Sequence, residues 1–454
     1  MKVIKFGGSS LADAVQIRKV CDIIISDPER RVVVVSAPGK GVNDPVKVTD
    51  MLISAASAAL ENGTEAGLAA METVIERYAS IARDLGVDQV MAEIAPDFRA
   101  RMELDRSLPT KFTDAVKAAG EDNSARLTAA YLCKLGCNAK YVNPGDAGMY
   151  LSDDFGNAQI LPKSYELLNK NLSGMEGIIV FPGFFGRTEA GETVTFPRGG
   201  SDITGAILAA ALNVDVYENF TDVDYVYSAN PHHVENPRPI PVVTYREMRE
   251  LSYAGFNVYQ EEALLPVYRV GIPVNIRNAN NPSCPGTLIV PERNSEIHED
   301  VRVAGVACDK GFTSVYVNKY LMNREIGFGR KLLEMFEDEG VSYEHTPTGI
   351  DDLTIIARSH YLENGVLDRI TARIKSELGT DDVQIHDGLS LIVVVGEGMK
   401  HAVGIAAKAT TALSEAGINI SMISQGSSEV SMIFAVDTAD AIRGVQALYN
   451  ALLA

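Results

Sequence analysis

The stretch from Gly177 to Asn213 constrains the fold more than any other part of the chain. It begins with an apolar run, Gly177–Phe181, which is typical of a strand buried on both faces of a parallel sheet. The alanine-rich segment Ile203–Leu212 predicts a buried helix whose N-cap is Ser201 or Asp202. A strand, a glycine-containing loop and a helix in this order predict an α/β fold.

The helix start carries the sequence Arg198-Gly199-Gly200-Ser201-Asp202. Two glycines at a helix start let backbone N–H groups approach an anion, which the helix dipole also favours. Arg198 adds a planar fork suited to a carboxylate or a phosphate. A glycine pair alone more often forms a tight turn, but the flanking arginine and aspartate favour an anion site.

A second glycine turn follows the first predicted strand. Lys2–Phe6 is that strand, Gly7-Gly8-Ser9-Ser10 is the turn, and Leu11–Ser26 has the apolar spacing of a helix. The spacing fits neither a P-loop nor a dinucleotide-binding fingerprint. Lys5 lies at the carboxyl end of the strand, where open α/β sheets bind ligands, and is therefore a candidate phosphate partner.

Residues 46–136 read as successive helices, with breaks predicted at Gly63, Gly86, Pro96 and Pro109 and a further helix starting at Gly120. Glu121 and Asp122 are acidic residues at this predicted helix start. Such residues stabilise the helix dipole, and they can also face a substrate ammonium group. Thr221 and Asp222 end a strand, where they cap a turn or hold a nucleotide. The run Ile272–Ile276 is predicted as the last strand of a first domain.

From about residue 303 onward, the predicted elements follow a different pattern. Two units repeat a strand, a helix that ends in glycine, and a strand hairpin, which is the split βαβ pattern of ferredoxin-like modules. The predicted strands are Val303–Cys308, Phe312–Asn318, Asp352–Ala357, Ser390–Val395 and Val430–Val436.

The length, net charge and cysteine content of the chain limit the kinds of protein and partner that are expected. A chain of 454 residues predicts two or three domains, and a net charge of −19 disfavours nucleic acid and anionic membranes as partners. The five scattered cysteines predict reduced thiols in a cytoplasmic protein, and no apolar run reaches membrane-spanning length. The adjacent His232 and His233 predict an exposed loop, so no resident metal site is expected.

Taken together and in order, Lys5–Ser10, Gly120-Glu121, Arg198–Asp202 and Thr221–Tyr227 resemble the aspartate kinases. The resemblance implies an amino-acid-kinase domain over 1–292, a three-layer αβα fold with an open, mainly parallel sheet. Two ferredoxin-like βαββαβ ACT modules are then expected over 312–383 and 384–454. The strand over 301–308 is a candidate partner of the second module.

The implied reaction is phosphoryl transfer from ATP, with Mg²⁺, to the side-chain carboxylate of L-aspartate, giving 4-phospho-L-aspartate. This is the first step of lysine, threonine and methionine biosynthesis, the lysine branch running through diaminopimelate. By resemblance, the catalytic residues are Lys5, Gly8 and Asp202. The aspartate pocket comprises Ser36, Thr49, Glu121, Arg198, Gly199, Gly200 and Ser201. The nucleotide site comprises Lys5, Gly7, Gly8, Ser9, Thr221, Asp222, Tyr227, His232 and Asn257.

The ACT half implies feedback by an amino acid, with lysine the expected effector and threonine, alone or with lysine, left open. Because ACT modules pair at their edges, a homodimer or a dimer of dimers is expected. The predicted effector contacts are Met322, Glu325, Gly327, Phe328, Ser342, Tyr343 and Glu344.

The chain departs from many relatives at two places. Asn230-Pro231-His232 stands where Asp-Pro-Arg is usual, and Gly255-Phe256-Asn257-Val258 stands where Gly-Ala-Lys-Val is usual. Both changes remove a cation near the ATP phosphates. The lost cations leave open an effector-binding regulatory protein with an inactive kinase domain. A kinase for another amino acid is a second alternative, within the same fold.

Overall fold

The computed structural model describes residues 1–41, 44–256, 261–293 and 301–454. The chain forms two compact units, and each is continuous in space but not in sequence. Unit 1 comprises Met1–Val226, Ile240–Tyr245 and Val258–Asn294, and unit 2 comprises Tyr227–Pro239, Arg246–Asn257 and Ser295–Ala454. Within the described ranges, no helix is both long and apolar enough to span a bilayer.

An eight-stranded sheet organises unit 1, in the order β10-β12-β11-β7-β1-β2-β4-β3. Neighbouring strands are parallel except β11 and β12, which are antiparallel. The predicted α/β fold with a mainly parallel sheet is thereby confirmed. The strands are β1 (Lys2–Phe6), β2 (Arg30–Val35), β3 (Ala139–Tyr141), β4 (Ile178–Pro182), β7 (Val216–Thr221), β10 (Val242–Thr244), β11 (Val274–Asn278) and β12 (Thr287–Val290), with a separate hairpin of β5 (Phe185–Arg187) and β6 (Thr193–Thr195).

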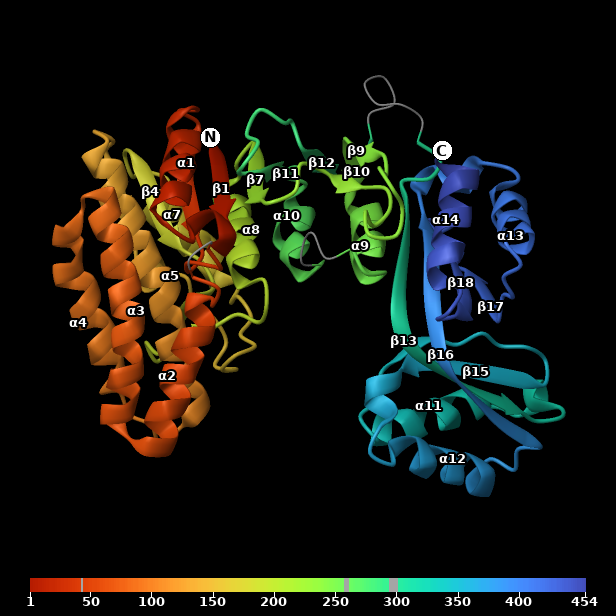
Figure 1. Ribbon diagram of the computed structural model, residues 1–454. Helices are drawn as coiled ribbons and strands as arrows, with labels where there is room; N and C mark the ends of the chain where they lie inside the picture. Colours follow the sequence, from red (N-terminus) through yellow and green to blue (C-terminus); the bar gives the residue numbers. More distant parts are fainter. Residues whose placement is uncertain (42–43, 257–260, 294–300) are drawn as a thin grey trace. The chain divides into compact units, whose positions relative to one another are not determined.

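Helices pack on this sheet, and α2, α3, α4 and α5 lie side by side at one end of unit 1 (Figure 1). One hydrophobic core joins them to α1 and to the strands β1 and β2. The α-helices of unit 1 are α1 (Ala14–Ile25), α2 (Val48–Asn62), α3 (Thr64–Leu85), α4 (Met91–Met102), α5 (Pro109–Lys134), α6 (Pro144–Ala147), α7 (Lys163–Leu172), α8 (Gly200–Leu212) and α10 (Leu265–Val270).

Pro96 does not end a helix, because it lies inside α4. A proline in a helix interior removes one backbone hydrogen bond. The neighbouring Ile94, Phe98 and Met102 are fully buried on one face of α4. Burying three large apolar side chains stabilises the helix by more than one hydrogen bond, so the helix continues through the proline.

The helix start predicted at Gly120 is also wrong, since α5 runs unbroken from Pro109 to Lys134. A Cβ atom at Gly120 would lie 2.8 Å from the Cβ of Ala37, so this glycine allows close packing against the loop after β2. Glu121 and Asp122 therefore lie in a buried helix interior and not at a helix end.

Ile272–Ile276 is not the last strand of the sheet. The four-residue strand β12 follows it and pairs with β11 in an antiparallel hairpin. The loop between them is rich in asparagine and proline, which hid so short a strand from the sequence pattern.

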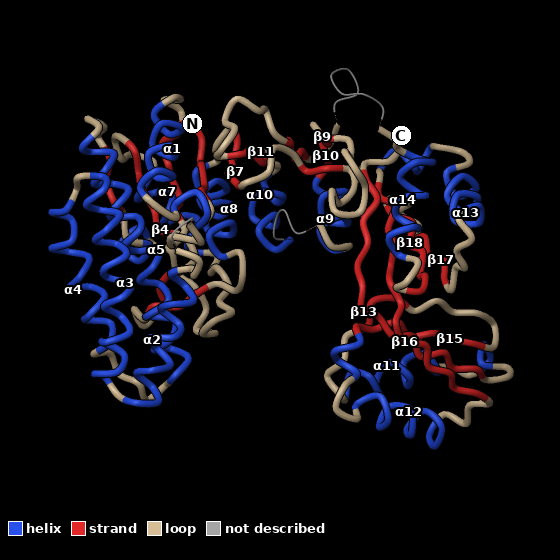
Figure 2. Tube along the Cα trace, in the orientation of Figure 1, coloured by secondary structure: helices blue, strands red, loops and turns tan. Residues whose placement is uncertain are grey.

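A six-stranded antiparallel sheet organises unit 2, in the order β14-β15-β13-β16-β18-β17. The two central strands, β13 (Gly305–Asn318) and β16 (Asp382–Val395), have 14 residues each. They lie side by side along the whole sheet (Figures 1 and 2). The two strands predicted at Val303–Cys308 and Phe312–Asn318 are therefore one, and Ser390–Val395 is only the end of another.

The two long strands connect the two halves of this sheet. Gly305–Lys310 pairs with Ser390–Val395, and Phe312–Asn318 pairs with Asp382–Leu389. The other elements are β8 (Val226–Tyr227, at the boundary of the units), β9 (Pro239–Ile240), β14 (Tyr343–His345), β15 (Asp352–Arg358), β17 (Met422–Gln425), β18 (Ser431–Asp437), α9 (Tyr245–Tyr253), α11 (Phe328–Asp338), α12 (Val366–Glu377), α13 (Ile405–Glu415) and α14 (Ala441–Leu452).

Candidate active site

The carboxyl ends of β1, β2 and β7 meet at one edge of the sheet in unit 1. β1 is parallel to both neighbours, with Lys5 opposite Val34 on β2 and opposite Asn219 on β7. Open α/β sheets bind ligands at the carboxyl ends of their strands. This edge is therefore the candidate active site.

Lys5 and Asp202, both predicted to be catalytic, are in direct contact. Nζ of Lys5 lies 2.6 Å from Oδ1 of Asp202, and the exposed fractions of the two side chains are 9% and 17%. Lys5 comes from β1 and Asp202 from the first turn of α8, so sheet and helix together hold the pair. A lysine fixed in this way presents a positive charge at the rim of the sheet.

Gly199 is the N-cap of α8, so the N-cap predicted at Ser201 or Asp202 is wrong. Its φ is +78°, a left-handed backbone that glycine adopts without the steric cost of a Cβ atom. The Gly199 carbonyl accepts hydrogen bonds from the N–H groups of Asp202 and Ile203, at 2.8 and 3.0 Å. Ser201 and Asp202 consequently lie in the first turn.

The glycine turn after β1 lies against the loop after β2. The N–H of Gly39 donates to the carbonyl of Gly8 at 2.8 Å, and a Cβ at Gly7 would lie 3.6 Å from Nζ of Lys5. Ser9 is exposed at this turn. Arg77 of α3, which the sequence analysis missed, donates to the carbonyls of Gly39 and Val46 and so fixes the second loop.

Glu121 reaches the same loop from α5. Its Oε1 accepts a hydrogen bond from the N–H of Ala37 at 3.0 Å, whereas its buried Oε2 has no hydrogen-bond partner among the described residues. Burial raises the pKa of Glu121 to about 7, and the hydrogen bond from Ala37 opposes that shift only in part. An unsatisfied carboxylate oxygen in a buried position is suited to a substrate ammonium group.

Two further predicted pocket residues, Ser36 and Thr49, lie near the loop that Glu121 contacts. Ser36 precedes Ala37, and Thr49 lies in the first turn of α2, whose Val48 N–H donates to the Pro38 carbonyl at 3.0 Å. Both side chains are half-buried. The loop after β2 therefore connects α2 to α5 at this edge.

Arg198 is exposed in the turn before α8. Within the part of the chain that the structure describes, its guanidinium forms no ion pair or hydrogen bond. Ser201 is buried, and a Cβ at Gly183 would lie 2.5 Å from its Oγ, so Ser201 packs on the loop after β4. The arginine is available to bind an anion.

Asn219 is a site residue that the sequence analysis missed. Its Nδ2 donates to Oδ1 of Asp202 at 2.6 Å, and the side chain is buried. The available signal was the adjacent polar pair Glu218-Asn219, which lies shortly before the predicted strand end at Thr221 and Asp222. On the opposite face of the sheet, Glu218 accepts from Arg30 at 2.6 Å and from Arg277 at 2.9 Å.

The predicted nucleotide residues fall into different parts of the molecule. Thr221 ends β7, and its Oγ1 donates to the exposed Asp222 at 3.1 Å. Tyr227 and His232 belong to unit 2, where the His232 N–H donates to Asn230 at 2.9 Å. Asn257 lies outside the described residues.

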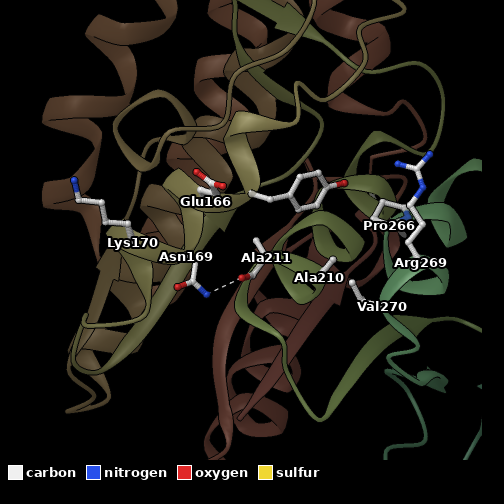
Figure 3. A pocket seen from close by; sticks show the side chains of 9 residues that line it. Glu166, Asn169, Lys170, Ala210, Ala211, Pro266, Arg269 and Val270 are labelled. Carbon is white, nitrogen blue, oxygen red and sulfur yellow. Dashed lines mark hydrogen bonds between the residues drawn. The ribbon is translucent and has the colours of Figure 1, made fainter.

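A hollow of about 550 Å³ opens at the far end of α8, between α7 and α10 (Figure 3). Its floor is formed by Ala210 and Ala211, and the charged ends of Lys170 and Arg269 lie at its opposite sides. No predicted site residue lines it. Since its charged groups do not converge, the hollow is not the candidate active site.

The predicted effector residues lie together in unit 2. Met322 and Phe328 are buried, and Gly327 is the left-handed N-cap of α11. Glu325 pairs with Lys319 at 2.5 Å and Lys331 at 2.9 Å, and the hydrogen bond from Lys319 is the main cause of its lowered pKa.

The remaining effector residues lie in β14 or directly before it. Ser342 and Tyr343 are exposed at the sheet edge. Glu344 accepts from Arg358 at 3.1 Å, and Arg358 also pairs with Asp309 at 2.8 Å. The described residues contain no cluster of three or more histidine, cysteine, aspartate or glutamate side chains that could hold a metal ion.

Comparison with known proteins identifies the family. The chain matches the amino acid kinase family over residues 1–278 and an ACT domain over 392–452. It is 53% identical to aspartokinase 3 of Bacillus subtilis, over 100% of this chain and 99% of that protein. The chain belongs to the aspartokinase family. It is accordingly an aspartate kinase with a C-terminal ACT region.

Solved structures agree with this aspartokinase assignment. The aspartate kinase of Clostridium acetobutylicum, described as an allosteric enzyme, is 37% identical with a TM-score of 0.87, over 100% of both chains. Escherichia coli aspartokinase III shares the fold at 24% identity over 100% of both chains. Its TM-score is 0.76 for the complex with aspartate and ADP and 0.75 for the complex with lysine and aspartate.

Proposed function

We propose that this aspartokinase transfers the terminal phosphoryl group of ATP to the side-chain carboxylate of L-aspartate through the edge formed by β1, β7 and α8. The product is 4-phospho-L-aspartate, which opens the route to lysine, threonine and methionine. The contact between Lys5 and Asp202 beside two glycine loops carries the proposal. The test is ADP release with aspartate, with glutamate and with no acceptor.

Each outcome of that assay supports a different candidate function. Release that depends on aspartate supports the proposal. Release with glutamate instead supports a kinase for another amino acid, and no release with either supports a regulatory protein with an inactive kinase domain. The presence of Lys5, Arg198 and Asp202 favours the first outcome.

The proposed mechanism needs no general base. The aspartate side chain has a pKa of about 3.9, so it is already ionised at neutral pH. The obstacle is the repulsion between two anions, which positioning and fixed positive groups overcome. Lys5 binds the transferring phosphoryl group, and the N–H groups at Gly8, Gly199 and Gly200 bind phosphate oxygens.

The residues at this edge fit a magnesium ion that arrives with the nucleotide. Mg²⁺ is usually held by one or two carboxylates together with substrate phosphates. Oδ1 of Asp202 is taken by Lys5 and Asn219, and among the described residues its Oδ2 has no hydrogen-bond partner. When bound, the ion neutralises charge on the phosphate oxygens. Asp202 is the proposed protein ligand.

Recognition of aspartate is assigned to contacts with the two charged groups on its α-carbon. Arg198 binds the α-carboxylate, and Glu121 binds the α-ammonium group. Ser36, Thr49 and Ser201 complete the pocket, while Thr221, Asp222, Tyr227, His232 and Ser9 are proposed for the nucleotide. The support is the placement of Glu121 beside the loop that carries Ser36.

We expect the KM for aspartate to fall as the pH rises from 6 to 8, because only ionised Glu121 attracts the substrate ammonium group. The pKa of about 7 places the transition within this range. Glu121→Gln should raise the KM at pH 8 by about 10-fold and remove its pH dependence, since one charged hydrogen bond is lost. Initial rates at several pH values measure this, with the KM for ATP as the internal control.

The raised pKa of Glu121 also predicts how the stability of the folded protein changes with pH. The folded state favours protonated Glu121, because the usual pKa of 4.5 is raised by burial. Stability is therefore lost as the pH rises from about 4.5 to 7. The melting temperature of Glu121→Gln relative to wild type should increase over that range, and a constant difference contradicts the burial argument.

Feedback is proposed to act through the ACT modules over 312–383 and 384–454, with lysine as the expected effector. The N–H groups at the start of α11 suit an α-carboxylate, and Glu344 suits an amine. The strands β14 and β17 form the two edges of the sheet in unit 2, which favours pairing with a second copy of the chain. A cytoplasmic location is proposed from the free cysteines.

Glu344→Ala is expected to abolish inhibition by millimolar lysine and to leave uninhibited turnover unchanged, because an effector typically couples by only about 1 to 3 kcal/mol. Arg358 keeps its partner Asp309 in this variant, so the sheet should stay folded. Glu334→Ala is the matched control, since Glu334 pairs with Arg330 on the exposed face of α11. A wild type that ignores lysine, threonine and both together contradicts the regulatory proposal.

A further inference from the structure

Asn219 is a buried amide in the middle of a rigid part of the sheet. Its backbone lies between β1 and β11, with Lys5 opposite it on one side and Ile276 on the other. Only 3% of the residue is exposed. Register partners in a sheet project to the same face, so Asn219 and Lys5 both point toward α8.

The hydrogen bonds fix which end of the amide faces Asp202. A carbonyl oxygen would repel a carboxylate, so the Nδ2 group must face Oδ1 of Asp202, at 2.6 Å. The same Nδ2 lies 3.4 Å from Oη of Tyr217, two residues earlier on β7. Oη of Tyr217 in turn donates to the backbone carbonyl of Asp202 at 3.2 Å. β7 thus holds both the backbone and the side chain of Asp202.

In this geometry the two carboxylate oxygens of Asp202 have different roles. Lys5 Nζ and Asn219 Nδ2 both bind Oδ1, each at 2.6 Å. A carboxylate that accepts two donors at one oxygen cannot rotate without losing both of them. Its other oxygen, Oδ2, is therefore held in a fixed direction without a hydrogen-bond partner among the described residues.

We propose that Asn219 is a positioning residue for phosphoryl transfer: it fixes the Asp202 carboxylate so that Oδ1 holds Lys5 and Oδ2 faces the magnesium-bound nucleotide. The inference rests on the proposed roles of Lys5 and Asp202. It adds a requirement that the ion pair alone does not impose, namely an amide donor at residue 219.

Two substitutions of similar size separate positioning from packing. Asn219→Leu removes the donor, and Asn219→Asp replaces it with a carboxylate next to Asp202. The charged or titratable groups that face residue 219 are Lys5, Asp202 and Tyr217. At the same size, the introduced carboxylate cannot donate to Oδ1 of Asp202 and repels it.

At pH 8, both variants are expected to lose about 10- to 100-fold in kcat, the usual effect of removing a partner that orients a metal ligand. The KM values should change by less than about threefold. Asn169→Asp is the matched control, because it removes an amide donor to Ala211 at the other end of α8 (Figure 3).

A binding measurement tests positioning without turnover. Calorimetric titration with ADP, in Mg²⁺ and in EDTA, gives the factor by which the ion tightens nucleotide binding. Asn219→Leu should lose most of this factor while its affinity in EDTA stays near wild type. Melting temperatures identify any variant that is globally unfolded, in which case the other variant decides the result.

Two results overturn the proposal: a kcat within twofold of wild type in either variant at pH 8, or an unchanged effect of Mg²⁺ on ADP binding in Asn219→Leu. Asp202→Asn and Lys5→Ala separate this inference from the proposed function. If those two variants keep wild-type turnover, the assigned roles of Lys5 and Asp202 are wrong. If they lose turnover while the Asn219 variants do not, only the role of Asn219 is wrong.

Discussion

Lys5→Ala is expected to lower kcat by about 100- to 1,000-fold, as the loss of one fixed group that stabilises developing charge usually does. Lys5 is held by Asp202 at the carboxyl end of β1, with its amine beside Gly7. Its charge can therefore act on a phosphoryl group in transfer more than on the folded state. Steady-state rates with saturating ATP and aspartate measure the effect, and the melting temperature should change little.

Lys2→Ala is the matched control for that experiment. Lys2 lies on the same strand at its amino end, where it pairs with Asp27 at 2.7 Å. Its replacement should leave kcat near the wild-type value. Near-normal turnover in Lys5→Ala, or an equal loss in Lys2→Ala, contradicts a specific role for Lys5.

Arg198→Lys is expected to raise the KM for aspartate by about 10- to 100-fold and to change the KM for ATP little. A bidentate contact with a carboxylate depends on the guanidinium fork, which lysine lacks although it keeps the charge. The loss of one charged hydrogen bond corresponds to about 1.5 to 3 kcal/mol. Because Arg198 has no partner among the described residues, its substitution should leave the fold intact.

The control is Arg83→Lys, an arginine on α3 whose side chain is 62% exposed and lies 3.6 Å from Glu76. It should leave both KM values unchanged. Equal increases in the two KM values of Arg198→Lys would instead assign Arg198 to the nucleotide. An increase for ATP alone would remove it from the aspartate pocket.

Unit 2 also contains two segments that precede the ACT region, Tyr227–Pro239 and Arg246–Asn257. Ala229 and Val234 belong to one hydrophobic core with Val394, Phe434 and Leu448. The backbone N–H of Arg238 donates to Oη of Tyr449 at 3.0 Å. The segment that carries Tyr227 and His232 is thus packed against α14. This segment therefore belongs to the same compact unit as the ACT region.

The sequence by itself predicted those features that depend on neighbouring residues. The apolar run of Lys2–Phe6 and the glycines that follow it define a buried strand and its turn. The repeated strand, helix and glycine pattern after residue 303 likewise predicts the ferredoxin-like region. Each signal spans fewer than about 20 residues, so propensity and periodicity suffice to detect it.

The sequence also placed Lys5 and Asp202 in one site, but only because their motifs resemble a family. Nothing in the spacing of residues 5 and 202 gives the 2.6 Å contact between them. That contact depends on the parallel pairing of β1 with β7 and on the packing of α8 against both strands. Strand order is a long-range property, and local patterns do not encode it.

Tertiary structure alone decided the remaining features. Gly120 looked like a helix start, yet the close approach of Ala37 places it within α5 and buries Glu121. The strands β13 and β16 each extend past the expected module boundary, because they pair with each other from Gly305 to Asn318, with two irregularities in register, and so satisfy most of their backbone groups. Asn219 became a site residue only because β7 lies beside β1, where its amide reaches Asp202.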